Sequence, residues 1–430
     1  MNHAELLQRR KRVMGPAYRL FYERPVHLVR GEGVWLYSAD GNKYLDCYNN
    51  VASVGHCHPR VVEAISNQAG QLNTHTRYLH ENIVQYAERL TATLPDEFSV
   101  CMFTCTGTEA NDLALRIARA VTGNRGVIVL DDAYHGNSNS VFDLSTEDYP
   151  VAEQPVYLET VEAPDGLRGR FRGDGPETGK AYGAMVGEAA TRLAGRGHPP
   201  AMFIADNIFS SNGILTPAPE YLREAYRQVR AAGGLAVADE VQSGLWRLGQ
   251  SAWAFETADV VPDIVTMGKP LGAGHPLAAV VTTAAIAEKF ANKYHYFNTF
   301  GGNPVSAAAG MAVLDVIEQE DIPGNVRTTG DYLEQGLRHL QARFGRIADI
   351  RGRGLFYGIE LVKDKKDLEP AGSDAVRLRE FLKENGVLLG TTGPHGNVVK
   401  IRPPMVFGLS LIHISEPTRP APLSRMPSSA

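Results

Sequence analysis

The chain has 430 residues, of which 43% are hydrophobic and 21% are charged, and its formal net charge at pH 7 is -5. This length is enough for two or three domains, and the composition is that of a soluble globular enzyme. A negative net charge argues against nucleic acid as the main partner, and no apolar stretch approaches the roughly 18 residues of a membrane span. We therefore expect a cytoplasmic protein with no nucleic-acid partner and no membrane association.

The predicted elements begin with a hairpin, in which residues 31–37 and 43–46 flank the turn at residues 39–42. From Cys101 to about Thr283, short apolar runs alternate with helical patterns. This alternation predicts crossover connections and a mostly parallel sheet. The apolar runs are residues 127–130, 201–205, 235–238, 264–266 and 278–281.

A helix starting at Pro304 is expected to lead into a smaller carboxyl-terminal domain, which has strand material at residues 354–361. Residues 409–430 are expected to be a non-native, disordered tail. Their composition favours disorder, and the prolines at 417, 420, 422 and 427 prevent a regular helix.

Lys269 closes an apolar run and is followed by glycine-rich turns. Burial would lower the pKa of its amine and make it a nucleophile toward an aldehyde. A second apolar run, residues 234–238, ends at Asp239. Ligands bind beyond the carboxyl ends of the strands in open parallel sheets, so we expect Asp239 and Lys269 to share one crevice. An isolated strand-end lysine would instead reach solvent.

A phosphate site is predicted where the helical pattern after Thr106 begins. Thr106 and Glu109 have the spacing of a capping box. Gly107 permits close approach of the backbone to a ligand, and Thr108 adds a hydroxyl beside free N–H groups. Such a helix start binds phosphate.

Together these segments resemble the class III aminotransferases, which use pyridoxal 5'-phosphate (PLP) on the fold type I scaffold. The family signature is met from Val237 through Gly274, and the resemblance covers about residues 15 to 408. Four more pieces agree: Gly107-Thr108-Glu109-Ala110-Asn111, Tyr134-His135-Gly136, Asn298-Thr299-Phe300-Gly301-Gly302-Asn303-Pro304 and Lys400-Ile401-Arg402-Pro403-Pro404.

The resemblance implies an α/β fold with a mostly parallel central sheet in a large domain and a smaller α+β domain built from both chain ends. We expect residues 1–50 to contribute to the small domain, 51–310 to form the large PLP-binding domain and 311–408 to complete the small domain.

The resemblance also implies roles for individual residues. Lys269 would hold PLP as a Schiff base and act as general base, and Asp239 would pair with the pyridine nitrogen. Gly107 and Thr108 would bind the phosphate. Thr299 would complete the phosphate site of a neighbouring subunit, which makes the protein a homodimer.

Further residues would hold the PLP ring. Tyr134 would stack on one face, Val241 would pack beneath the other, and Gln242 would hydrogen-bond the ring hydroxyl. His135 belongs to the same cofactor-binding set, and Tyr134 is also counted with the catalytic residues. Ordinary core packing is the alternative for Tyr134 and Val241.

Substrate preference turns on Arg402, which lies where the family places a carboxylate-binding arginine; the alternative is a surface arginine between prolines. Many members mask this arginine with a glutamate, but Ser211 occupies that place here, and Asp206 stands where glutamate is usual. The resemblance thus implies an aminotransferase that moves an amino group from an amino acid or amine to a 2-oxo acid by a ping-pong mechanism.

Two alternatives stay open. Residues 49–52, 54–59 and 73–80 resemble the branch of the family that holds ethanolamine-phosphate phospho-lyase and alanine–glyoxylate aminotransferase 2. The first alternative is therefore a phospho-lyase that eliminates phosphate and ammonia from O-phosphoethanolamine, with Arg77, His80 and Arg402 as candidates for binding the substrate phosphate. The second is a non-catalytic PLP-binding scaffold.

No metal site is expected. His56-Cys57-His58 is the one suggestive run, but adjacent residues of an extended segment point to opposite faces.

Overall fold

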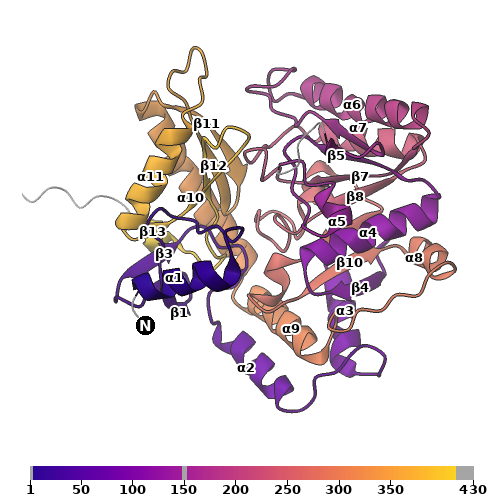
Figure 1. Ribbon diagram of the computed structural model, residues 1–430, viewed down its shortest axis with the longest axis horizontal. Coiled ribbons are helices and arrows are strands. Elements are labelled where there is room, and N and C mark those ends of the chain that lie inside the picture. The colour runs from indigo at the N-terminus through magenta and orange to yellow at the C-terminus, as the bar shows by residue number, and fades with distance from the viewer. Residues whose placement is uncertain (1–2, 148–152, 413–430) are drawn as a thin grey trace, which may run out of the picture.

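The computed structural model describes residues 3–147 and 153–412. Its larger part is built around a seven-stranded sheet of order β4-β10-β9-β8-β7-β5-β6 (Figure 1). Strands β5 to β9 pair in parallel, while β10 runs antiparallel to both of its neighbours. The predicted mostly parallel sheet is confirmed. The strands are β4 Val100–Thr104, β5 Gly126–Leu130, β6 Leu158–Val161, β7 Pro200–Asp206, β8 Leu235–Asp239, β9 Ile264–Met267 and β10 Ala278–Thr282.

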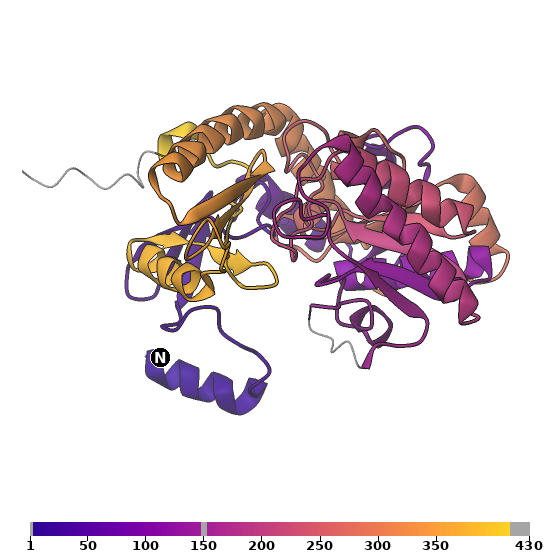
Figure 2. The ribbon, with the colours of Figure 1, turned by 90° about the horizontal axis from the view of Figure 1, so that it is seen from above.

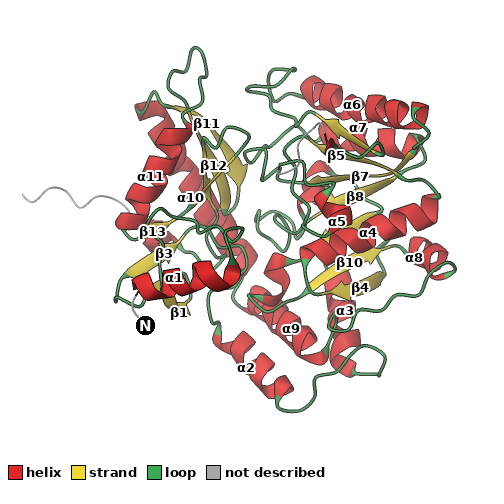
Figure 3. Ribbon diagram, in the orientation of Figure 1, coloured by secondary structure: helices red, strands yellow, loops and turns green. Residues whose placement is uncertain are grey.

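Helices cover both faces of this sheet (Figure 3). Successive side chains of a strand point to opposite faces, so Ile128 packs with one group of helices while Val127 and Val129 pack with another. Helices α6 (Pro176–Gly195) and α7 (Glu220–Ala231) supply the first group, and α4 (Gly107–Thr122) supplies the second. Burial on both faces explains why these strands are continuous apolar runs.

Helix α9 (Pro304–Gln319) begins at the predicted proline, and the side chain of Asn303 accepts a hydrogen bond from the backbone N–H of Ser306. Helices α2 (Pro59–Ala69) and α3 (Glu81–Thr91) pack on it. The remaining helices of the larger part are α5 Asn139–Phe142, α8 Ala284–Ala291 and the 3-10 helices η2 Ala254–Ala258 and η3 Lys269–Gly272.

The smaller part draws on both ends of the chain, which lie side by side in Figures 1 and 2. One of its sheets has the order β1-β2-β3-β13 and the other β11-β12-β15-β14. Strands β2 and β3 form a hairpin around the predicted turn, but the predicted first strand, residues 31–37, is broken at residues 33–34, and its start belongs to β1, which pairs antiparallel with β2. The predicted domain limits stay predictions. The strands are β1 Leu28–Glu32, β2 Trp35–Ser38, β3 Lys43–Asp46, β11 Ile347–Arg353, β12 Phe356–Leu361, β13 Val387–Leu388, β14 Gly390–Thr392 and β15 Val398–Ile401, and the helices are α1 His3–Met14, α10 Ile322–Arg343 and α11 Gly372–Glu384.

The expected disordered tail differs from the structure at its start. Residues Leu409–Ile412 form a short helix, α12, and Leu411 and Ile412 pack against the core. This apolar run precedes the first proline of the tail, so its backbone can form a helix, and burial of its side chains stabilises that helix. Residues 413–430, on which the rest of that prediction falls, lie outside the described residues.

Candidate active site at the carboxyl edge of the sheet

A cavity of about 390 Å³ opens beyond the carboxyl ends of β8 and β9. This volume lies in the range of small-molecule sites. Most of the residues singled out in the sequence line it. They are Gly107, Thr108, Tyr134, His135, Asp239, Val241, Gln242 and Lys269.

Asp239 and Lys269 reach this cavity from neighbouring parallel strands. Asp239 is the last residue of β8, and Lys269 begins η3 two residues after β9. Burial and the charge of Arg402 lower the pKa of the Lys269 amine, and Asp239 opposes them in part. The lowered pKa increases the fraction of neutral, nucleophilic amine near pH 7.

Asp239 is held by a buried network that sequence reasoning missed. Asn111 donates a hydrogen bond to its Oδ2 at 2.9 Å, and Nδ1 of His135 lies 2.7 Å from the same oxygen. The Oδ1 atom accepts the backbone N–H of Val241 at 3.1 Å. Asn111 is itself fixed because its Oδ1 accepts the hydroxyl of Thr266 at 2.6 Å. A carboxylate oxygen accepts two hydrogen bonds, so Oδ1 keeps one position for a donor in the cavity.

The start of α4 is a ready anion site. Thr106 and Glu109 form the predicted capping box, in which the Glu109 carboxylate accepts the backbone N–H groups of Cys105 and Thr106. The N–H groups of Gly107 and Thr108 lie in the first turn, where no helical carbonyl can accept them. They therefore remain as donors at the positive end of a 16-residue helix.

Two apolar surfaces flank the centre of the cavity. Tyr134 is 41% exposed, whereas Val241 is almost completely buried. Val241 also packs tightly beneath Gly107, because a Cβ atom at position 107 would lie 2.9 Å from both of its γ-carbons. Only glycine therefore permits this approach of the helix start to Val241.

Arg402 is buried, which rules out the surface arginine that the sequence left open. Its Nε and Nη2 donate to the backbone oxygen of Tyr48, and its Nη1 donates to the side-chain oxygen of Gln242. A guanidinium carries five N–H groups, so two stay available. The amide nitrogen of Gln242 also remains free to donate, since its oxygen is the atom that Arg402 engages.

Lys400 is a second cation that sequence reasoning missed. It lies in β15, two residues before Arg402, which follows the strand directly, and alternate residues of an extended segment share one face. Burial and the charge of Arg402 lower the pKa of the Lys400 amine to about 7. Within residues 3–147 and 153–412, no carboxylate lies within ion-pair distance of this amine. The i, i+2 spacing of two cations was the available signal.

Ser211, which stands where many family members have the glutamate that masks the arginine, has a glutamate beside it in the structure. The Ser211 hydroxyl donates to Glu147 at 2.7 Å, and the charge of Glu147 raises the pKa of Lys400. Asp206 lines the cavity, and burial together with the charge of Asp239 raises the pKa of its carboxyl group.

Four predicted residues do not line this cavity within one chain, and of these Arg402 contacts the lining residue Gln242. Thr299 is exposed. Arg77 is exposed too, and its guanidinium carbon lies 3.9 Å from the centre of the Phe297 ring. His80 caps α3, where its ring nitrogen accepts the backbone N–H of Asn82. The roles expected for Thr299, in the site of a neighbouring subunit, and for Arg77, at the substrate phosphate, stay predictions.

The model of the class III aminotransferase family matches residues 21–415. The chain belongs to this family. A relative from Drosophila melanogaster, named alanine–glyoxylate aminotransferase 2-like, is 43% identical over 416 residues, which is 95% of this chain and 84% of the relative. Ethanolamine-phosphate phospho-lyase homolog 1 of Caenorhabditis elegans is 39% identical over 94% of this chain and 90% of its own length. A solved Arthrobacter phospholyase in complex with phosphoethanolamine has a TM-score of 0.91 and 43% identity, covering 95% of this chain and 97% of that one.

Family membership makes this chain a PLP-dependent enzyme. The cavity fits that cofactor in each of its chemical parts. An amine with a lowered pKa can meet the aldehyde, the free acceptor position on Asp239 can meet a protonated ring nitrogen, and the first turn of α4 can meet the phosphate.

The sequence also led us to expect no metal site, no membrane association and a cytoplasmic location. Among the described residues, no group of three or more His, Cys, Asp or Glu side chains is placed to hold a metal ion. No helix in those ranges combines the length and apolarity that a membrane crossing demands. The cytoplasmic location stays a prediction, since the names of two similar proteins place those proteins in mitochondria.

Proposed function

We propose that this enzyme is a phospho-lyase that converts O-phosphoethanolamine and water into acetaldehyde, ammonia and inorganic phosphate. The observation that carries this proposal is a pair of cations whose charges interact: Lys400 in β15 and Arg402 directly after that strand. A carboxylate is satisfied by one bidentate arginine, whereas a phosphate dianion has three oxygens and twice the charge. A second cation with no ion pair among the described residues therefore favours a phosphate substrate over a carboxylate.

Comparison with known proteins supports the same choice. The Arthrobacter phospholyase, whose structure holds phosphoethanolamine, is 43% identical to this chain and aligns over 95% of it. The family resemblance alone favoured transamination, whereas the second cation, Lys400, favours the phospho-lyase reaction.

PLP supplies an aldehyde carbon that bonds to an amine and a protonated ring that accepts the electrons released when a neighbouring C–H bond breaks. Asp239 keeps the ring nitrogen protonated, and Asn111 and His135 hold Asp239 in place. Gly107 and Thr108 bind the cofactor phosphate, Tyr134 and Val241 hold the ring between them, and Gln242 donates to the ring hydroxyl.

Lys269 then has two tasks. Its amine binds the cofactor between turnovers, and it removes the proton from the amine-bearing carbon of the substrate once the substrate has taken its place. Arg402 and Lys400 bind the phosphate, and they neutralise the charge that develops as the carbon–oxygen bond breaks. In the phospho-lyase reaction, the electron pair released from the C–H bond expels phosphate from the next carbon. In transamination, the same pair would instead form a new C–H bond on the cofactor.

The proposed enzyme acts as a homodimer. Thr299 and Arg77 lie on the surface of one chain, on segments that also expose Phe297, Phe300 and Leu79. An apolar surface of this kind favours association, and it would let Thr299 reach the cofactor phosphate of the neighbouring subunit and Arg77 reach that subunit's substrate phosphate.

The test is an assay of purified holoenzyme with O-phosphoethanolamine and no oxo acid. We expect continuous release of phosphate and acetaldehyde in equal amounts. Turnover that stops after one equivalent per site, and resumes when pyruvate or glyoxylate is added, would refute the proposal.

Transamination is the second candidate, favoured by the buried Arg402 with its two free N–H groups. In that reaction Lys269 returns the proton to the cofactor side of the bond, and a 2-oxo acid completes the ping-pong cycle. An assay of pyruvate and glycine formation from alanine and glyoxylate measures it directly.

A further inference from the structure

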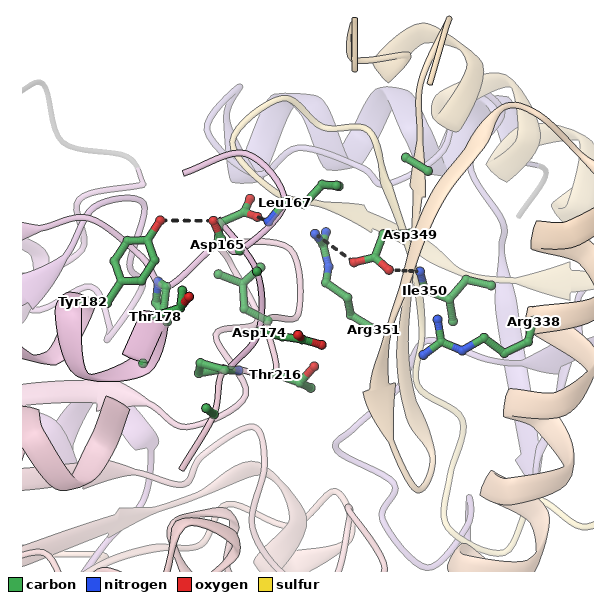
Figure 4. A pocket seen from close by; sticks show the side chains of 18 residues that line it. Asp165, Leu167, Asp174, Thr178, Tyr182, Thr216, Arg338, Asp349, Ile350 and Arg351 are labelled. Atoms are coloured by element: carbon green, nitrogen blue, oxygen red, sulfur yellow. Dashed lines mark hydrogen bonds and ion pairs between the residues drawn. The ribbon is translucent and has the colours of Figure 1, made fainter. Parts of the chain in front are cut away.

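A second cavity, of about 400 Å³, lies between the larger and smaller parts of the molecule. It shares no lining residue with the candidate active site. The loop at residues 164–174 and the start of α6 form one wall, and β11 and α10 form the other. In Figure 4, Asp349 and Arg351 of the smaller part face Asp165 and Asp174 of the larger part.

The start of α6 gives this cavity a positive end. The N-cap residue is Gly175, which has no side chain to accept the first N–H groups, and Pro176 follows it. The Thr178 hydroxyl is used elsewhere, since it donates to the backbone oxygen of Arg172 at 3.0 Å. Thr178 lines the cavity, so a free backbone N–H from the first turn of this 20-residue helix is beside it, whereas the N–H of Gly179 already donates to the backbone oxygen of Gly175 at 3.1 Å.

Arg351 is an independent indication of an anion. Its side chain is 8% exposed, and its Nη2 forms an ion pair with Glu360 at 2.6 Å. Its Nε and Nη1 are buried, and neither has a hydrogen-bond acceptor in the described part of the chain. The nearest carboxylate to Nη1 is Asp349, at 3.8 Å. Leaving buried guanidinium N–H groups unpaired is costly, and an anionic ligand would satisfy them.

Acidic side chains lie on the wall that faces Arg351, next to the start of α6. Asp174 is exposed, and none of the described cations lies within ion-pair distance of it. The Oδ1 atom of Asp165 accepts the backbone N–H groups of Leu167 and Arg168, which leaves its other oxygen for a ligand. Arg338 lines the cavity but is already paired with Glu334 at 3.2 Å. The cavity thus offers acceptors for a cation a short distance from donors for an anion.

We propose that this interdomain cavity binds a small zwitterion, with a carboxylate or phosphate at Arg351 and the start of α6 and an ammonium group at Asp174. The bound molecule would join the two parts of the fold. Arg351 belongs to the same sheet as β15, which carries Lys400 and leads directly into Arg402, so occupancy of this site would also restrain the strand that contributes to the candidate active site. The proposal does not depend on which reaction the enzyme catalyses.

The test measures binding by calorimetry to holoenzyme that has first been treated with borohydride, which fixes the cofactor in the active site. The probes are two matched pairs. O-Phosphoethanolamine is compared with ethyl phosphate, and β-alanine is compared with propionate, so that each pair differs in its ammonium group.

Arg351→Lys keeps the charge opposite Glu360 but loses the planar fork. Arg168→Lys is the matched control, because Arg168 also pairs with Glu360 but does not line this cavity. We expect each zwitterion, O-phosphoethanolamine and β-alanine, to bind at one site per chain. Arg351→Lys should weaken the binding of both about fivefold or more, and Arg168→Lys should leave it unchanged. The exposed variant Asp174→Asn should reduce the affinity of the zwitterion to that of its partner without the ammonium.

Three results would overturn the proposal. The first is the absence of saturable binding at millimolar probe. The second is equal affinity in the Arg351→Lys and Arg168→Lys proteins. The third is equal affinity of both members of each probe pair for the unmodified chain.

Discussion

The pKa of Lys400 makes the proposed substrate site dependent on pH in a way that one substitution should remove. Burial and the neighbouring Arg402 lower this pKa to about 7, so the charged fraction of the amine falls about tenfold for each pH unit above 7. Arginine at this position stays charged over the whole range. The ratio of kcat/KM for Lys400→Arg to that of the unmodified enzyme should therefore rise about tenfold, or about 1.4 kcal/mol, per unit between pH 7.5 and 9.

The assay is phosphate release from O-phosphoethanolamine. The parameter kcat/KM reports ionisations of free enzyme and free substrate, and those of the substrate cancel in the ratio. Lys363→Met is a suitable control, since Lys363 is exposed and pairs with Glu369. A ratio that stays constant across this pH range would refute a charge-bearing role for Lys400.

The same pKa has a consequence for stability. The pKa of the Lys400 amine is about 7 in the folded chain and 10.5 at its ordinary value, so the folded chain binds this proton less readily than the unfolded chain. The difference destabilises the folded state fully below pH 7, and the penalty disappears as the pH rises toward 10.5. At about 1.4 kcal/mol per pKa unit, the penalty is at most about 5 kcal/mol. Lys400→Met should therefore raise the free energy of unfolding at pH 6, with a difference that shrinks by pH 10. Denaturant unfolding at both pH values measures it, and a pH-independent difference would contradict the assigned burial.

Three other substitutions test the cofactor site. Lys269→Ala should lower phosphate release by about a thousandfold or more while circular dichroism stays unchanged. Asn111→Leu removes a donor from Asp239 and should weaken PLP binding about tenfold by fluorescence titration, so an unaltered affinity would argue against the network. Gly107→Ala places a Cβ 2.9 Å from Val241, and the forced shift should cost about 1–3 kcal/mol of PLP affinity.

The sheet and the two central residues of the site were accessible from sequence because the signals are local. Strands buried on both faces are continuous apolar runs, and parallel pairing brings their carboxyl ends to one edge. Asp239 and Lys269 each follow such a run, so their shared cavity follows from topology. The capping box at Thr106 is equally local, because both partners lie within one helical turn.

Other features depend on contacts that sequence spacing does not encode. Asn111 lies within the buried part of α4, and only the fold shows that its amide faces Asp239, 128 positions away. Lys400 looks like one more residue of a short strand, and only the fold shows that its amine is buried and interacts electrostatically with Arg402. His80 has a local role as a helix cap, which the resemblance to a phospho-lyase segment concealed.

The central claim is that Lys269 holds PLP in the cavity that it lines together with Asp239. Borohydride reduction of the holoenzyme, followed by proteolysis and mass spectrometry, tests it most directly. We predict one phosphopyridoxyl group per chain, on the peptide that contains Lys269, and its loss from that peptide in the Lys269→Ala protein. A label on another lysine, or holoenzyme that releases all of its cofactor after reduction, would contradict the claim.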